Sequence, residues 1–307
     1  MDEPLLQTRP ACPVCATTAY DRVLDLPFDS PPLDAYLRTF YEGRLDPARL
    51  ADHRYVLDRC SGCGVRYQRE VPGPAFLEEL YDDLARGDGE DVSRRRGLPT
   101  RQAYAYDVEQ LVKHWNRSPA EIRVLDYGSG FGDWLRMAAA YGCGVAAAEL
   151  SPRKAAALAG TGTDVLPVDD LPSDRFHFIN TEQVFEHLIE PGDTVRRLAR
   201  SLVPGGLLRI SVPNGRGIDA ALATPDWQLP KGDPASLNAI APLEHVNCWE
   251  HESLTALGRI GGLDVFRYPL RQFLDPMERI RHVGGAVLHR VRPPRGTLVL
   301  FRRPPTG

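Results

Sequence analysis

Two pairs of cysteines are the first residues in this sequence whose type and spacing suggest chemistry. The motif CPVC begins at Cys12, and the motif CSGC begins at Cys60. Four thiolates arranged in two such pairs are the usual ligands of a structural Zn²⁺ ion, which has no open coordination position. Two redox dithiols, or thiols that bind nothing, are the alternatives. We expect Cys12, Cys15, Cys60 and Cys63 to bind a structural Zn²⁺ ion that has no role in catalysis.

A glycine-rich turn follows a short apolar run in VLDYGSGFG, at residues 124–132. Asp126 ends the apolar run, and Gly128 and Gly130 let the backbone turn tightly and approach a ligand without Cβ clashes. A second acid, Glu149, ends the next apolar run, where a carboxylate can accept hydrogen bonds from both hydroxyls of a ribose. The spacing GxGxG differs from the GxGxxG of dinucleotide-binding proteins. The turn alone is weak evidence, but together with Glu149 it predicts a nucleotide-type site.

Histidines and glutamates gather in two segments of the second half of the chain. EQVFEHL places Glu186 and His187 after an apolar run, and LEHVN contains His245. A neutral imidazole can accept a proton from a hydroxyl or an α-carbon near pH 7. One carboxylate and two imidazoles can instead hold a divalent metal ion with open coordination positions. The third alternative is a purely structural role for these residues, as helix caps or hydrogen-bond partners.

The elements that must position these residues alternate along the second half of the sequence. From Thr100 onward, helix-like segments alternate with the strand-like runs IRVLDY, GVAAAEL, FHFINT, LLRISVP, LDVFRYPL and GTLVLFRR. This alternation predicts a doubly wound, mostly parallel sheet. Ligands of such sheets bind beyond the carboxyl ends of the strands, where Asp126, Glu149 and EQVFEHL would lie.

The sequence divides into blocks of different composition. We expect a zinc-binding module in residues 1–84, a charged and glycine-rich linker in 85–99, and an α/β domain in 100–307. Residues 214–246 form an unusually long connection between a strand and the next helix. We interpret this segment as a substrate-binding or lid insertion.

Composition argues against several classes of protein. The hydrophobic content of 43% is typical of a globular protein. The net charge of −4 argues against nucleic acid or an anionic membrane surface as a partner. There is no apolar stretch of about 18 residues that would predict a transmembrane helix. The N-terminal MDEPLLQTRP lacks the basic and apolar regions of a signal peptide. We therefore expect a cytoplasmic protein with a small-molecule substrate and reduced thiols.

Taken together, the motifs of residues 100–305 resemble those of class I S-adenosylmethionine-dependent methyltransferases. VLDYGSGFG resembles their first motif, FHFINTEQVFEHL their segment after strand 4, and LVPGGLLRISVPN the segment that carries strand 5. The resemblance implies a Rossmann-like, seven-stranded sheet of order 3-2-1-4-5-7-6 and S-adenosyl-L-methionine as cofactor. It also implies the cofactor-binding residues, which would be Asp126, Gly128, Ser129, Gly130, Glu149, Leu150, Asp169 and Thr181.

The N-terminal block resembles the zinc-binding module of deoxysugar C-methyltransferases, over CPVC, VLDLP and YVLDRCSGCGVRYQREVPG. Those enzymes carry a further C-terminal domain, whereas this sequence ends soon after the seventh predicted strand. The resemblance implies transfer of a methyl group to carbon or oxygen of a small polar acceptor, a sugar or an intermediate of natural product biosynthesis. His245 would be the general base, and Glu186 and His187 would orient it or the acceptor.

Two other functions stay open. QVFEH is similar to the ExxEH metal motif of RNA 3′-end 2′-O-methyltransferases and ubiquinone-pathway O-methyltransferases, with Gln183 in place of the first glutamate. A divalent metal would then be held by Glu186, His187 and His245. The chain could also be a non-catalytic, cofactor-binding scaffold, against which the intact glycine turn argues.

Overall fold

The computed structural model describes residues 4–80, 97–269, 272 and 296–305. The chain packs as two compact units, neither of which is continuous in sequence. The first unit consists of Met1–Gly89, Gln183–Arg196 and Ser211–Gly261, and the second of Glu90–Glu182, Arg197–Ile210 and Gly262–Gly307. Most of the linker expected at 85–99 lies outside the described residues. The domain boundaries expected from the sequence remain a prediction.

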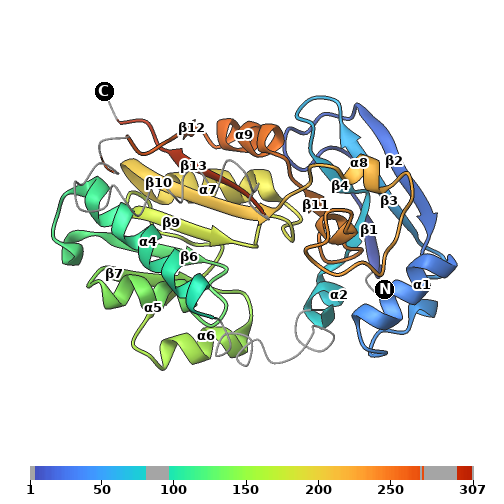
Figure 1. The fold of residues 1–307 in the computed structure, drawn as a ribbon, viewed down its shortest axis with the longest axis horizontal. Helices are drawn as coiled ribbons and strands as arrows, with labels where there is room; N and C mark the ends of the chain where they lie inside the picture. The colour runs from blue at the N-terminus through green and yellow to red at the C-terminus, as the bar shows by residue number, and fades with distance from the viewer. Residues whose placement is uncertain (1–3, 81–96, 270–271, 273–295, 306–307) are drawn as a thin grey trace. The chain divides into compact units, whose positions relative to one another are not determined.

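Seven strands form one sheet in the order β8-β7-β6-β9-β10-β13-β12 (Figure 1). β6 pairs in parallel with both β7 and β9, β7 pairs in parallel with β8, and β13 is antiparallel to β12. Numbered by sequence within this sheet, the order is 3-2-1-4-5-7-6, so the expected Rossmann-like sheet is confirmed. The strand bounds are β6 Arg123–Tyr127, β7 Gly144–Ala148, β8 Asp164–Leu166, β9 Phe176–Glu182, β10 Leu202–Pro213, β12 Asp264–Val265 and β13 Gly296–Arg302.

One predicted strand is much shorter than its apolar run suggested. Among the described residues of LDVFRYPL, 263–269, strand pairing is limited to Asp264–Val265, where both side chains are exposed at the edge of the sheet. The amide of Phe266 donates to the carbonyl of Leu300, 2.7 Å away, just beyond the strand. The ring of Phe266 packs edge to face against Tyr268. Side-chain packing, and not a longer ladder, therefore accounts for this apolar run.

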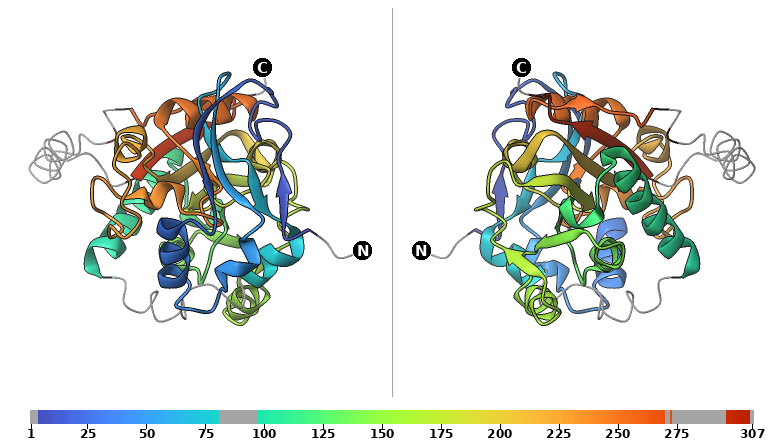
Figure 2. Two further views of the ribbon diagram at one scale, coloured as in Figure 1. Left: turned by 90° about the vertical axis from the view of Figure 1, so that its right-hand side faces the viewer. Right: turned by 90° about the vertical axis from the view of Figure 1, so that its left-hand side faces the viewer.

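Helix α4 runs along one face of the sheet (Figure 2). Its residues Tyr104, Val108 and Leu111 recur at helical spacing and are buried against the strands. The helix ends at Trp115, and the C-cap residue Asn116 has a φ of 46°, the left-handed conformation common at helix C-termini. The helices between residues 98 and 201 are α4 Leu98–Trp115, η3 Pro119–Glu121, α5 Asp133–Ala140, α6 Pro152–Ala159 and α7 Pro191–Ser201.

The first unit contains a four-stranded antiparallel sheet in the order β11-β4-β3-β2. The strands are β2 Tyr20–Pro27, β3 Arg54–Cys60, β4 Arg66–Gln68 and β11 Asn247–Cys248. A separate pair joins β1 Leu6–Thr8 to β5 Glu70–Pro72. The helices are α1 Pro31–Phe40, η1 Pro47–Leu50, α2 Pro74–Glu79, α8 Ile218–Ala221, η4 Leu237–Ile240 and α9 His251–Ile260.

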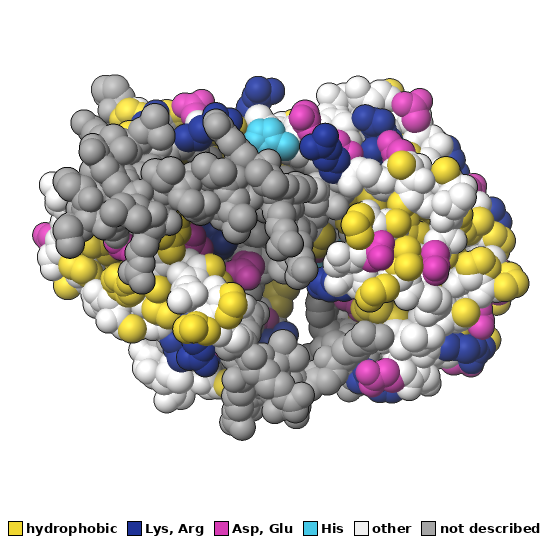
Figure 3. Space-filling model, in the orientation of Figure 1, with side chains coloured by type: hydrophobic (Ala, Val, Ile, Leu, Met, Phe, Trp, Pro, Cys, Tyr) yellow, Lys and Arg dark blue, Asp and Glu magenta, His cyan; other side chains and the backbone are white. Residues whose placement is uncertain are grey.

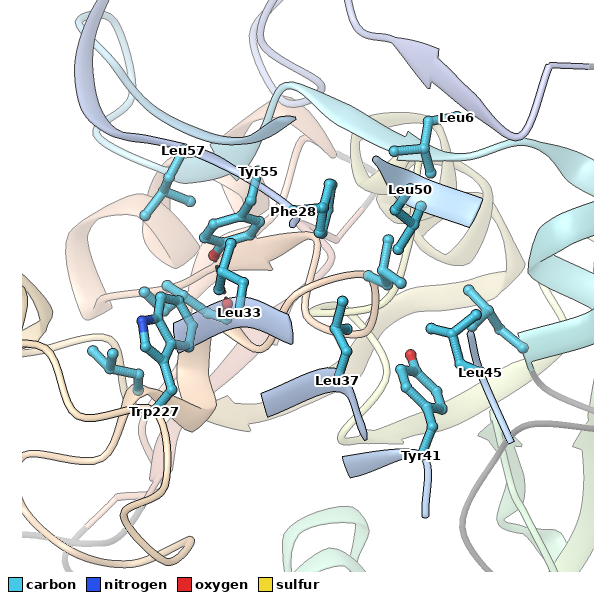
Figure 4. Packing of buried hydrophobic residues seen from close by; sticks show 14 of the residues in the cluster. Leu6, Phe28, Leu33, Leu37, Tyr41, Leu45, Leu50, Tyr55, Leu57 and Trp227 are labelled. Carbon is cyan, nitrogen blue, oxygen red and sulfur yellow. Dashed lines mark hydrogen bonds between the residues drawn. The ribbon is translucent and has the colours of Figure 1, made fainter. Parts of the chain in front are cut away.

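The core of the first unit is built from two parts of the chain that are far apart in sequence, within residues 6–80 and 218–248 (Figure 4). Leu33 and Leu37 of α1 are 0% exposed and lie in the same cluster as Tyr55 of β3. Trp227, from the expected insertion at 214–246, places its ring 5.6 Å from the ring of Tyr55. The Tyr55 hydroxyl donates to the carbonyl of Ile240 at 2.5 Å. The insertion is therefore packed into the core of this unit in the structure.

Candidate functional site

The glycine turn between β6 and α5 is held by the end of β7. Gly128 and Gly130 have φ values of 72° and 56°, in the left-handed region that favours glycine. The amide of Gly128 donates to the carbonyl of Ala148 at 2.8 Å, and the amide of Gly130 donates to Oε2 of Glu149 at 2.7 Å. Oε1 of Glu149 accepts from the amide of Ser151 at 2.9 Å. Because each carboxylate oxygen has two lone pairs, Glu149 can still accept hydrogen bonds from a ligand.

The space beside this turn suits a nucleoside-containing cofactor. A Cβ atom built on Gly130 would meet no other atom within 4 Å, so a ligand can approach the backbone there. The buried hydroxyl of Ser129 has no hydrogen-bond partner among the described residues. Leu150 follows Glu149 and is 65% exposed, which leaves its apolar side chain available to a ligand. An open turn, an orphaned hydroxyl and a carboxylate with spare lone pairs fit S-adenosylmethionine.

Asp126 belongs to a hydrogen-bonded chain that crosses three neighbouring strands. Its Oδ1 accepts from Nδ2 of Asn180 in β9 at 2.8 Å, and Oδ1 of Asn180 accepts from Nη1 of Arg209 in β10 at 2.7 Å. Asp126 is 4% exposed. Burial raises its pKa to about 7, against the opposing effects of the Asn180 hydrogen bond and the Arg209 charge. Asp126 can therefore change its ionisation near neutral pH.

Arg209 lies among acidic groups of neighbouring elements. Its guanidinium lies 3.3 Å from a carboxylate oxygen of Asp107 and 3.7 Å from one of Glu182. The hydroxyl of Tyr104 donates to Glu182 at 3.2 Å. The sequence did carry a signal for this network, because Asn180 and Arg209 are polar residues inside otherwise apolar strand runs.

Two further residues expected at the cofactor site have protein partners in the structure. The buried hydroxyl of Thr181 donates to the carbonyl of Arg209 in the neighbouring strand, at 3.1 Å. Asp169 has a side chain that is 81% exposed and forms an ion pair with Arg197 at 3.0 Å. Their contacts with a cofactor remain predictions.

The three candidate catalytic side chains lie together in the first unit. Glu186, His187 and His245 each offer one ligand atom, and these three atoms lie within 4.8 Å of one another. The rings of His187 and His245 meet edge to face, with centroids 4.9 Å apart. Nε2 of His187 is 3.8 Å from Oε1 of Glu186. The structure thus joins two segments that are far apart in the sequence.

Backbone carbonyls determine which nitrogen of each imidazole carries the proton. Nδ1 of His187 lies 2.8 Å from the carbonyl oxygen of Glu244, and Nδ1 of His245 is hydrogen-bonded to the carbonyl oxygen of Asn238. A carbonyl oxygen can only accept, so Nδ1 must be the donor in both rings. In the neutral rings the lone pair is therefore on Nε2, where it can accept a proton or bind a metal ion.

Burial governs the charge of the groups around this site. It lowers the pKa of His245 well below its usual value, and charges on His187 and Lys231 act in the same direction. His245 is therefore neutral at pH 7. Burial raises the pKa of Glu244, against the opposing hydrogen bond from the Tyr41 hydroxyl at 2.9 Å.

A cavity of about 460 Å³ opens beside the two histidines. Part of its lining is aromatic: Tyr36 and Phe40 of α1 stack with centroids 5.3 Å apart, and Trp227 meets Tyr36 at 5.8 Å. The lining also includes the polar residues Gln183, Glu186, His187, Glu244 and His245. The volume is in the range of cavities that bind small molecules. All of these residues belong to the first unit.

The four predicted zinc ligands form one cluster. Sγ of Cys12 is 3.6 Å from Sγ of Cys63, and Sγ of Cys15 is 3.4 Å from Sγ of Cys60. All four sulfur atoms lie within 4.8 Å of one another. Tetrahedral Zn²⁺ with bonds of about 2.3 Å would separate its sulfur ligands by about 3.8 Å, whereas a disulfide needs about 2.05 Å. The donor set and its spacing fit a structural Zn²⁺ ion.

The visible surface carries charges of both signs. On the face shown in Figure 3, basic, acidic and hydrophobic side chains are interspersed. Among the residues with a described structure, no helix combines the length and the apolar character needed to cross a membrane.

Sequence comparison gives two kinds of match. A family model described as a methyltransferase domain matches residues 100–267. A ubiquinone biosynthesis O-methyltransferase from Xanthomonas axonopodis pv. citri (strain 306) is 31% identical over 185 residues, which cover 55% of this chain and 77% of that protein. A protein of the same description from Xanthomonas oryzae pv. oryzae (strain PXO99A) is 30% identical over 184 residues, with the same coverage.

Comparison of structures gives more distant matches. Phosphoethanolamine N-methyltransferase 2 of Haemonchus contortus, in complex with S-adenosyl-L-methionine, is 16% identical with a TM-score of 0.49, and the match covers 78% of this chain and 63% of that one. A plantazolicin methyltransferase in complex with SAH is 15% identical with a TM-score of 0.48, and the match covers 74% and 94%.

Proposed function

This chain belongs to the family of S-adenosylmethionine-dependent methyltransferases, and from that we propose that it methylates an oxygen or carbon atom of a small polar molecule. The observation that carries the proposal is the cavity of about 460 Å³, whose lining includes His187 and His245. A lining that combines aromatic rings with polar groups suits a ring that bears hydroxyl groups, as in a sugar or an intermediate of natural product biosynthesis.

The cofactor would be held by the glycine turn of the second unit. The open space at Gly130 would let the cofactor approach the backbone, and the hydroxyl of Ser129 would gain a hydrogen-bond partner. The free lone pairs of Glu149 would accept hydrogen bonds from the ribose hydroxyls, and the carboxylate of Asp126 would attract its positive charge. When bound, the cofactor supplies a methyl group that is already activated by a sulfonium.

The remaining task of the chain is to align the acceptor and manage its proton. Nδ1 of His245 is engaged by the carbonyl of Asn238, so its Nε2 is the atom available to take the acceptor's proton. Glu186 and His187, within 4.8 Å, would orient that imidazole or the acceptor. A structural Zn²⁺ ion on the four cysteines would stabilise the unit that forms the cavity.

Transfer of a labelled methyl group tests this function. The protein is incubated with S-adenosylmethionine carrying a radioactive methyl group and with host extract separated into small-molecule, RNA and protein fractions. We expect label in the small-molecule fraction, and we expect Asp126→Asn protein to transfer much less. Label in RNA or protein instead would contradict the proposed acceptor class. Cofactor binding without label in any fraction would favour a non-catalytic scaffold.

A divalent metal ion at the histidines is a second candidate, and the protonation pattern specifically favours it. Metal-binding histidines usually donate their other ring nitrogen to a carbonyl or carboxylate, as Nδ1 of both His187 and His245 does. Glu186 would complete the ligand set, and the metal would lower the pKa of a bound acceptor hydroxyl. Calorimetric titration with Mn²⁺ of protein that retains its structural Zn²⁺ tests this, with Glu186→Gln as the variant that should bind more weakly. No binding to either protein would exclude the metal.

Cofactor affinity should depend on pH through Asp126. Its pKa is about 7 in the folded protein, and a positively charged cofactor binds better to the carboxylate than to the neutral acid. Below pH 7 the carboxyl group of Asp126 must lose a proton when the cofactor binds. The Kd should therefore rise by up to roughly tenfold for each unit by which the pH falls below 7. Calorimetry from about pH 5.5 to about pH 7.5 measures this. Asp126→Asn should flatten the profile, and a flat profile in the unaltered protein would rule out the effect.

A further inference from the structure

Asn247 joins the two segments that carry the histidine site. Its backbone amide donates to the carbonyl of Glu186 at 3.0 Å. Its side-chain Nδ2 donates to the carbonyls of Phe185 at 3.0 Å and Leu188 at 2.6 Å. Asn247 is 0% exposed and lies two residues after His245. Three hydrogen bonds from one residue therefore fix the backbone around Glu186 against the backbone around His245.

Arg9 holds Asn247 from the other side. Nη1 of Arg9 donates to Oδ1 of Asn247 at 2.9 Å and to the carbonyl of Val246 at 3.3 Å, and Nη2 donates to the carbonyl of Leu188 at 3.3 Å. Arg9 is 4% exposed, and although burial lowers its pKa to about 10, it stays charged at neutral pH. A guanidinium can only donate, so Oδ1 of Asn247 must face it. Nδ2 must then face the two carbonyls.

This arrangement is a costly way to fill a core. A buried guanidinium and a buried amide each lose hydration on folding, and apolar side chains of similar volume would fill the same space at lower cost. What the polar pair adds is direction, because its donors hold the carbonyls of Phe185, Glu186, Leu188 and Val246 at defined positions. The segments so fixed are those that carry Glu186, His187 and His245.

We propose that Asn247, oriented by Arg9, is a positioning residue that sets the relative placement of Glu186, His187 and His245. The catalytic importance of that placement rests on the proposed function, but the placement itself does not. Asn247 touches none of the reacting groups and acts through the backbone. Its contribution should therefore be visible in the histidine rings of protein without any ligand.

The variant Asn247→Asp isolates the effect. The aspartate has the same shape, and its carboxylate can still accept from Arg9, but it cannot donate to the carbonyls of Phe185 and Leu188. We expect the imidazole ¹⁵N signals of His187 and His245 to shift and the share of the Nδ1–H form to fall. Two-dimensional NMR of protein labelled with ¹⁵N-histidine measures both quantities.

The chain offers matched controls for this experiment. His53 lies in the same unit and is bonded to Glu70, and His114 and His177 lie in the other unit, so their signals should stay unchanged. Asn116→Asp makes the same chemical change at an exposed helix end and should shift neither His187 nor His245. Should Asn247→Asp fail to fold, Arg9→Lys keeps the charge but loses the two-armed contact, and it should shift the same two signals.

Two outcomes would overturn the proposal. Unchanged signals of His187 and His245 in folded Asn247→Asp or Arg9→Lys protein would show that the contact does not position them. A shift shared equally by His53, His114 and His177 would show a general loss of structure instead. Methyl transfer plays no part in the readout, so failure of the proposed function would leave this result standing.

Discussion

Replacing Cys60 with serine is expected to abolish Zn²⁺ binding and to unfold much of the first unit. A structural Zn²⁺ ion contributes an apparent ~10–16 kcal/mol in small zinc-binding peptides, which matches or exceeds the ~5–15 kcal/mol stability of a typical domain. Cys60 is 2% exposed and ends β3, the strand that carries Tyr55 into the core. The hydrophobic core of this unit offsets part of the loss, so we expect residual structure without fixed packing.

Metal analysis and thermal unfolding check this result. The unaltered protein should contain about one Zn²⁺ per chain, as four cysteine ligands complete one tetrahedral site. The fluorescence of Trp227 and Trp249, both in the first unit, should report the lost packing. Cys143→Ser changes a buried thiol of the other unit outside the cluster and should retain the metal. A Cys60→Ser protein as stable as Cys143→Ser would exclude a structural metal.

Replacing His245 with asparagine should lower methyl transfer by about 10²-fold or more while cofactor binding stays unchanged. The side-chain amide of asparagine can take over the hydrogen bond from Nδ1 to the carbonyl of Asn238, but it has no lone pair equivalent to Nε2. The variant thus removes the proton acceptor and keeps the local structure. The glycine turn, in the other unit, should bind the cofactor as before.

The rate of label transfer to the acceptor fraction and calorimetric titration with S-adenosylmethionine measure the two quantities. His251→Asn serves as matched control, because His251 is an exposed residue at the start of α9. Unchanged turnover would remove His245 from the mechanism. Loss of cofactor binding would instead give it a structural role. Stimulation of activity on adding Mn²⁺ to unaltered protein that retains its structural Zn²⁺, but not to the His245→Asn variant, would favour its alternative role as a metal ligand.

The sheet and the glycine turn could be predicted because their signals are local. Apolar runs of strand length and the spacing of Gly128 and Gly130 are readable within a few residues, and alternation with helices restricts the topology. The second-half strands were found in the expected order. The same logic overextended the run at LDVFRYPL, since an apolar run does not distinguish a paired strand from residues that pack through their side chains.

The partners of buried polar residues could not be predicted, because they are set by contacts between distant segments. Nothing near Asn247 in the sequence indicates that Arg9 would orient it, and nothing near Asn180 indicates Arg209. The periodicity of apolar residues likewise does not predict that Trp227 packs against Tyr55. Local patterns state which side chains are buried, whereas tertiary structure alone decides what each buried donor and acceptor meets.

The pairing of β11 with β4 has a consequence for the order of synthesis and folding. Asn247 pairs with Tyr67, so the sheet of the first unit gains its last strand only after residue 248 has left the ribosome. At ~5–20 residues per second, roughly 10–40 s separate the two strands during translation. Until then the edge of β4 stays unpaired, and the side chains of Tyr36 and Tyr55 lack their contacts with Trp227. Both stay accessible to chaperones and to other nascent chains. Binding of Zn²⁺ by the two cysteine pairs soon after their synthesis would make the N-terminal segment that contains them compact before β11 is available.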